Sequence, residues 1–203
     1  KKDHLLDCLK STGTEIRQVR KATPFANINL KDNVDVIYRR DSVFRINVTA
    51  GQNLIDGIIT ELEGNTLYIR NENRCNWVRS FKNKFTIEVS APALTMVSMY
   101  GSGTFSTVDT LVSNVFTCES WNASGSAKLL VNTSECALKN HIGRADFQVS
   151  GRTHVAFINI NDTGVLNAAG LQSYHCYIRS STTGRCTINS TYEIDRKSTR
   201  LNS

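Results

Sequence analysis

Three observations predict that the chain is an all-β protein built as a parallel β-helix, a solenoid with about 20 residues per coil. The composition is rich in Ser, Thr, Asn and Val and includes only two Pro residues, which suits short strands joined by polar turns. Segments such as "IGRADFQVSG" (142–151) alternate apolar with polar residues, as a strand with one buried face does. The same alternation recurs along the second half of the chain.

The recurrence can be aligned on glycines that are spaced by 22, 18, 21 and 20 residues: Gly103, Gly125, Gly143, Gly164 and Gly184. We use "column" for the residues at one position of successive coils. The column two positions after the glycine is apolar: Phe105, Ala127, Ala145, Leu166 and Cys186. The column seven positions before it is also apolar: Met96, Cys118, Cys136, Phe157 and Tyr177. Each glycine is expected at a tight corner with positive φ.

Stacked coils predict which side chains are buried. Residues of the apolar columns and of the strand in 142–151 should lie inside: Cys136, Ala145, Phe147, Phe157 and Leu166. Residues of the polar column three positions after the glycine should be exposed: Lys128, Asp146 and Asn167. A β-sandwich also alternates, but it does not keep a polar and an apolar column through successive units. A helical repeat should show a 3.6-residue spacing, which is absent here.

The domain organisation follows the regularity of the pattern. Residues 1–92 are expected to form less regular, β-rich coils or a cap, and residues 93–192 the regular coils. Residues 193–203 are expected to be an unpatterned tail, in which "RKSTRLNS" resembles a translated cloning or assembly scar.

Charge and motif spacing argue against several function classes. The net charge is +6, but the basic residues are scattered and form no nucleic-acid-binding motif, so we expect no nucleic-acid partner. The carboxylates of successive coils stand at different offsets, so no pair suited to glycoside hydrolysis is evident. The four histidines also lie at unmatched offsets. We therefore expect no catalytic residue, no metal ligand and no cofactor.

The segment "RNENRCNWVRSFKNK" (70–84) is the surface candidate for binding. It interleaves guanidinium groups with aromatic rings, which suits sugar rings or acidic polymers. The candidate binding residues are Arg70, Arg74, Trp77, Arg79 and Phe81. The alternative is a solvated loop in which Trp77 packs back as a cap.

The sequence resembles the family of the putative auto-transporter adhesin, head GIN domain. The resemblance rests on "STGTEIRQVRKATPFANINLKDNVDVIYRRD", "AGQNLIDGIITELEGNTLYIRNENRCNWVRS", "FTIEVSAPALTMVSMYGSGTFS" and "SGSAKLLVN", within residues 8–192. It implies a right-handed parallel β-helix, export across the inner membrane and, in many members, a lipid anchor. It implies no established catalytic activity.

The six cysteines fit no CxxC or metal spacing. Cys118 and Cys136 share one apolar column and Cys186 lies in another, so all three are expected to be buried thiols. Cys8 and Cys75 accompany each other in the stretches that match the family. We predict that they form a disulfide worth about 4 kcal/mol by loop length.

The combined expectation is a non-enzymatic, exported cell-envelope protein with an adhesin-like binding surface, in the periplasm, on the outer membrane or outside the cell. Its expected partner is a glycan or another surface polymer, with peripheral or lipid-anchored membrane association and homo-oligomers as further options. Two alternatives stay open: a polysaccharide lyase or hydrolase on the same scaffold, and a purely structural envelope protein.

Overall fold

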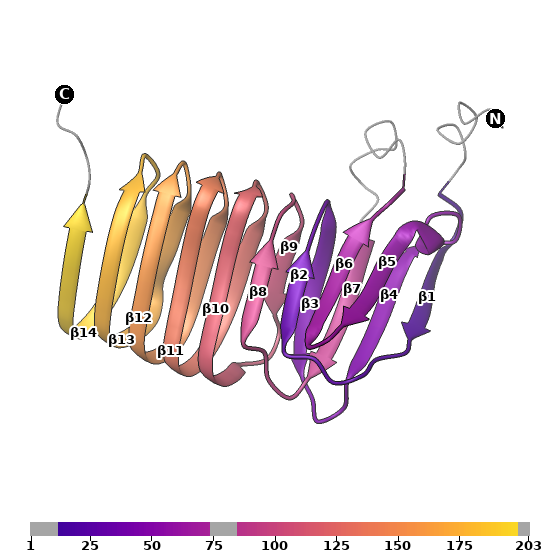
Figure 1. Ribbon diagram of the computed structural model, residues 1–203, viewed down its shortest axis with the longest axis horizontal. Helices are drawn as coiled ribbons and strands as arrows, with labels where there is room; N and C mark the ends of the chain where they lie inside the picture. The colour runs from indigo at the N-terminus through magenta and orange to yellow at the C-terminus, as the bar shows by residue number, and fades with distance from the viewer. Residues whose placement is uncertain (1–11, 74–84, 199–203) are drawn as a thin grey trace.

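The protein is a β-solenoid of about five turns with about 20 residues per turn, which confirms the expected fold (Figure 1). The computed structural model describes residues 12–73 and 85–198. Within these ranges there is no α-helix, and the single 3₁₀ turn is η2 (Ile55–Gly57). No helix in the described part of the chain has the length and apolar character needed to cross a membrane.

The regular coils are made by long strands, each of which bends around a corner and contributes to two walls. These strands are β10 (Leu111–Ala123), β11 (Ser126–Gly143), β12 (Asp146–Asp162), β13 (Val165–Thr182) and β14 (Cys186–Ser198). They pair in parallel, each with the next. The first wall contains residues 126–131 of β11, and the second wall contains residues 136–140. The two walls enclose the core, and Figure 1 shows them as a front and a back layer.

The N-terminal strands extend both walls, but not in sequence order. They are β1 (Glu15–Arg20), β2 (Asn27–Leu30), β3 (Val34–Arg40), β4 (Arg45–Gly51), β5 (Ile58–Glu63), β6 (Thr66–Asn71), β7 (Phe85–Ala91), β8 (Met96–Met99) and β9 (Thr104–Thr107). In the first wall β3 lies between β7 and β9, and in the second β2 lies between β6 and β8. Antiparallel pairs, β4 with β1 and β7 and β5 with β6, occupy this end.

The core consists of inward side chains stacked from coil to coil. Phe105, Phe116 and Phe147 are fully buried. Tyr38 is also fully buried, and its hydroxyl donates a hydrogen bond to Ala91 O at 2.9 Å. Burial raises the Tyr38 pKa to about 12. A buried tyrosine with a satisfied hydroxyl adds apolar area to the core without leaving a polar group unpaired.

The corner column differs from the expected one at a single coil. Asp146 N donates to Gly125 O and Val165 N donates to Ala145 O, so Ala145 stacks between Gly125 and Gly164. Gly143 instead pairs with Ala123, two positions earlier on the coil. The 18-residue spacing between Gly125 and Gly143 therefore came from aligning Gly143 in the wrong register. In the correct register the inward column is Phe105, Ala127, Phe147, Leu166 and Cys186.

Most of the corner glycines are needed because the backbone of a neighbouring coil lies close to them, and not because they have a positive φ. A Cβ on Gly125 would lie 2.1 Å from Gly103 O, and a Cβ on Gly184 would lie 2.2 Å from Gly164 O. Among the five aligned glycines, only Gly143 has a positive φ, at 98°. The expected positive φ is therefore wrong at the other four, where the preceding coil leaves no room for a side chain.

The burial expectations hold for most positions. Ala145, Phe147, Leu166 and Cys136 are buried, and Lys128 and Asn167 are exposed. Asp146 is only half-buried because it pairs with Ser126 and Val165, not with Lys128.

Phe157 is the clear error, since it is 42% exposed. Its column comprises Thr117, Ala137, Phe157, Tyr177 and Asp195, and it faces out of the second wall. The expected column had mixed this outward set with inward residues. Cys118 and Cys136 are both buried but lie in different columns, since Cys118 pairs with Leu138 and Cys136 with Phe116 and Ala156.

The strand β14 continues to Ser198, past the expected start of an unpatterned tail at residue 193. Glu193, Ile194 and Asp195 pair with His175, Cys176 and Tyr177 of β13. The side chains of residues 191–197 are nonetheless all exposed. Backbone pairing thus extends further than the apolar and polar alternation of the sequence does.

Candidate ligand-binding groove

Exposed aromatic side chains gather on the last three strands. Phe157, Tyr174 and Tyr177 are each 42% exposed, and Tyr192 is 68% exposed. They come from β12, β13 and β14, which lie side by side (Figure 1). Most other aromatic rings of the described chain point into the core, so this cluster stands out as a candidate binding surface.

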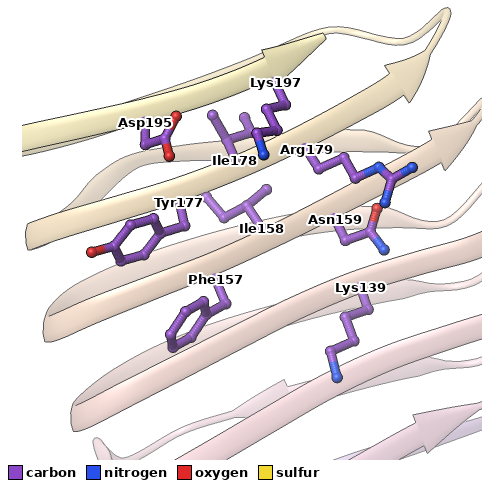
Figure 2. Close-up of a pocket in the computed structure, with 9 residues that line it drawn as sticks. All are labelled: Lys139, Phe157, Ile158, Asn159, Tyr177, Ile178, Arg179, Asp195 and Lys197. Carbon is purple, nitrogen blue, oxygen red and sulfur yellow. The ribbon is translucent and has the colours of Figure 1, made fainter. Parts of the chain in front are cut away.

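Two neighbouring outward columns of the second wall form a groove. One contains Phe157 and Tyr177, and the other contains Lys139, Asn159 and Arg179 (Figure 2). The columns are two residues apart along each strand, and the buried Ile158 and Ile178 lie between them in sequence. Strand alternation therefore places rings and charged groups on the same face.

The ring pair is ordered by the register of the strands. Phe157 pairs with Tyr177, and the ring centroids are 5.5 Å apart with planes 16° from parallel. Such an arrangement stabilises both rings while leaving apolar surface open to the solvent. The groove beside them has a volume of about 290 Å³ and is completed by Asp195 and Lys197 of β14.

The cations of the groove are available to a ligand. Among the described residues, Lys139, Arg179 and Lys197 have no ion pair and no side-chain hydrogen bond. With Asp195 as the only carboxylate on the lining, three positive charges and one negative charge give the groove a net charge of +2.

A second aromatic cluster lies at the adjacent corner. His154 stacks on Tyr174 at 5.1 Å between centroids, and Tyr174 stacks on Tyr192 at 4.7 Å. His175 meets the Tyr174 ring edge-on, and its Nδ1 is 3.1 Å from Glu193 Oε2. Since His154 precedes Phe157 by three residues, this corner flanks the groove on its aromatic side.

The sequence candidates lie elsewhere. Arg70 is at the end of the solenoid that carries the antiparallel strands, where its guanidinium contacts Glu61 at 2.7 Å and Glu72 at 2.8 Å. These contacts occupy the charge that was expected to bind a ligand. Arg74, Trp77, Arg79 and Phe81 lie outside the described residues, as do Cys8 and Cys75.

Sequence reasoning missed the groove because the misaligned column assigned Phe157 and Tyr177 to the core. The signal was nonetheless present, since "AFINI" and "CYIRS" align ring with ring and Asn159 with Arg179. Pairing Leu138 with Ile158, one residue after Phe157, is what places Phe157 and Tyr177 in an outward column.

The lining of the groove includes one carboxylate, that of Asp195. Glycoside hydrolysis uses two carboxyl groups that flank the bond, whereas Asp195 is the only carboxylate on this lining. Within the described ranges, no three His, Cys, Asp or Glu side chains gather where they could hold a metal ion.

The sequence matches the family model for the putative auto-transporter adhesin, head GIN domain, over residues 24–199. The chain belongs to this family. The match covers all the strands from β2 to β14, including the groove of this GIN domain. No curated protein matches this chain.

Solved structures share the fold at low sequence identity. A putative adhesin from Bacteroides fragilis has a TM-score of 0.83 and 20% identity, with 91% of this GIN domain and 84% of that chain covered. A putative lipid binding protein from Parabacteroides distasonis has a TM-score of 0.66 and 17% identity, with 92% of each chain covered. A putative adhesin from Parabacteroides merdae has a TM-score of 0.55 and 14% identity, with 90% and 97% covered. The family suggests a cell-surface or exported protein.

Proposed function

We propose that this GIN domain is a non-enzymatic, exported cell-envelope protein that binds a glycan through the groove on its second wall. The observation that carries the proposal is the pair of exposed rings, Phe157 and Tyr177, beside a column of unpaired cations. Aromatic rings offer sugars an apolar, rigid contact, and charged side chains fix the position of polar groups.

The adhesin-like family supports a role at the surface, where the protein would stand in the periplasm, on the outer membrane or outside the cell. A solenoid suits this role because its walls give a long, continuous surface on which neighbouring coils contribute equivalent positions. A lipid anchor elsewhere in the protein would hold the groove near the membrane.

The proposal can be tested on a glycan array with the purified protein and two tyrosine variants. Tyr177→Ala should abolish most of the signal of any bound glycan. Tyr100→Ala is the matched control, since Tyr100 is 40% exposed but lies outside the groove. The bound glycan should be recovered intact after incubation. Release of shorter products, or equal binding by both variants, would contradict the proposal.

A further inference from the structure

The charged column of the groove runs along the solenoid axis. Lys139 pairs with Asn159, Asn159 with Arg179, and Arg179 with Lys197, on four successive strands. Neighbouring strands are about 4.8 Å apart, so Arg179 and Lys197 are one strand spacing apart and Lys139 and Arg179 are two. The cations thus repeat in the direction perpendicular to the strands.

The aromatic column runs parallel to the charged one. Ala137, Phe157 and Tyr177 occupy the same strands as Lys139, Asn159 and Arg179, two residues earlier. The groove therefore has one apolar side and one cationic side, both extending along the axis (Figure 2). This geometry fits an extended polymer with an apolar edge and regularly spaced negative groups.

We propose that the ligand is an anionic polysaccharide, with carboxylate or sulfate groups, that lies across β11 to β14 along the solenoid axis. Its sugar rings pack against Phe157 and Tyr177, and its acidic groups pair with Lys139 and Arg179, whereas Lys197, which lies in "RKSTRLNS", is not required. This inference rests on the proposed glycan-binding function and adds the charge and direction of the ligand.

Charge complementarity favours an acidic polymer over a neutral one. The three cations have no partner among the described residues, and a net charge of +2 in an open groove attracts anions. Asn159 Oδ1 is buried and makes no hydrogen bond within the described structure. Because solvent does not reach this oxygen, a ligand in the groove would contact the cations and not Asn159 Oδ1.

A nucleic acid is the less suitable polyanion. Proteins that bind single strands without sequence preference combine a longer basic groove with rings on which bases stack. Here the two rings already face each other at 5.5 Å between centroids, which leaves no space for a base between them. The short cationic column also ends where Asp195 adds a negative charge to the lining.

Calorimetric titration with oligogalacturonate and with a cello-oligosaccharide of equal length tests the inference. The acidic oligomer should bind at least about tenfold more tightly, and added salt should weaken it because exposed charge pairs are screened. Arg179→Glu should lower its affinity at least about tenfold, as loss of a charge-assisted contact does. Lys139→Glu is the second variant, for use if the first fails to fold.

Lys128→Glu is the matched control, since Lys128 is exposed on the first wall and lies outside this groove. It should leave the affinity within about twofold, because the opposite wall is beyond the range of screened charges. Equal affinity for the two oligomers, or wild-type binding by Arg179→Glu and Lys139→Glu, would overturn the anionic ligand and leave glycan binding intact. Tighter binding of oligothymidylate would also overturn it. Absence of binding to any glycan would overturn the proposed function itself.

Discussion

Phe157 and Tyr177 lie on adjacent strands with ring centroids 5.5 Å apart, and both rings are outside the core. Phe147 lies on the same strand as Phe157 but is fully buried. One strand therefore carries a phenylalanine that packs in the core and another that contacts its neighbour at the surface. Substituting each in turn compares the contributions of core packing and of a surface contact to stability.

Phe147→Ala should destabilise the fold by about 3–5 kcal/mol, because it removes a buried ring and leaves a cavity between coils. Phe157→Ala should cost only about 0.5–1.5 kcal/mol, the range of an aromatic pair at a surface. Denaturant unfolding of both variants against the wild type gives the comparison. Similar losses for the two would mean that the assignment of inward and outward columns is wrong.

The burial of these residues shows how far the sequence predicts the fold. Alternation along each strand and the 20-residue recurrence predicted the solenoid, because both follow directly from stacked coils. The register of one coil was not predicted, since Ala145 takes a corner position that glycine holds in its neighbours. A shift of two residues preserves the inward and outward alternation, so Ala145 and Phe147 were still correctly expected to be buried.

The candidate groove was less predictable because it depends on the exact register. Cys136 pairs with Ala156, which directly precedes Phe157 in the chain. Placing Phe157 in the column of Cys136 therefore assigned its side chain to the wrong face of the strand. The sequence repeat also does not predict the order of the N-terminal strands. β2 and β3 lie between strands that come more than 30 residues later in the chain. Nothing in their local pattern indicates this order.

A partly buried carboxylate should make stability depend on pH. Glu119 is 14% exposed, and desolvation alone would raise its pKa. Hydrogen bonds from Trp121, Ser98 and His141 outweigh this effect and hold the Glu119 pKa below its usual value. A lowered pKa in the folded state stabilises the fold above the unfolded-state pKa of about 4.3, and this contribution is lost as the pH falls below it.

Glu119→Gln should therefore lower the melting temperature at pH 7, and its effect should shrink as the pH falls through the lowered pKa of the folded state, where the wild-type carboxylate becomes protonated too. Glu135→Gln is the control, because the Glu135 side chain is exposed and a surface substitution there should change stability little. A melting-temperature difference that stays constant from pH 3 to pH 7 would contradict the role of the Glu119 charge.

The described cysteines should differ in reactivity. Burial raises the pKa of the Cys136 thiol to about 12, and it raises the Cys118 pKa as well. Cys186 was expected to be buried, but it is only half-buried because it lies on the last coil, so a thiol reagent should reach it first. Peptide mass spectrometry after brief alkylation of the native protein measures this order. Labelling of Cys118 as fast as Cys186 would show that the coils open more readily than the packing implies.

The predicted Cys8–Cys75 disulfide has its own test, a non-reduced digest in which one peptide pair should carry both residues. Reduction should then lower the free energy of unfolding by about 4 kcal/mol. A free Cys8 thiol in the freshly purified, oxidised protein would reject this pairing.

The final coil gives the last prediction, because β14 pairs only with β13 among the described strands. Leu166 N donates to Arg185 O at 2.9 Å, and Leu166 pairs with Cys186. Successive N–H groups of a strand point to opposite sides, so the Thr187 N–H faces β13 whereas the Cys186 N–H faces away from it. In β12, both sides are occupied, by β11 and β13.

Amide exchange at low protein concentration should therefore be fast at Cys186 and slower at Thr187, while Phe147 and Gln148 of β12 should both be strongly protected. If an exposed strand edge recruits a second copy of the chain by strand addition, protection of the Cys186 amide should rise with protein concentration while Phe147 stays unchanged. Sedimentation over the same concentration range distinguishes this association from a local change. Strong protection of Cys186 in the dilute monomer would mean that other residues of the chain already cover the edge.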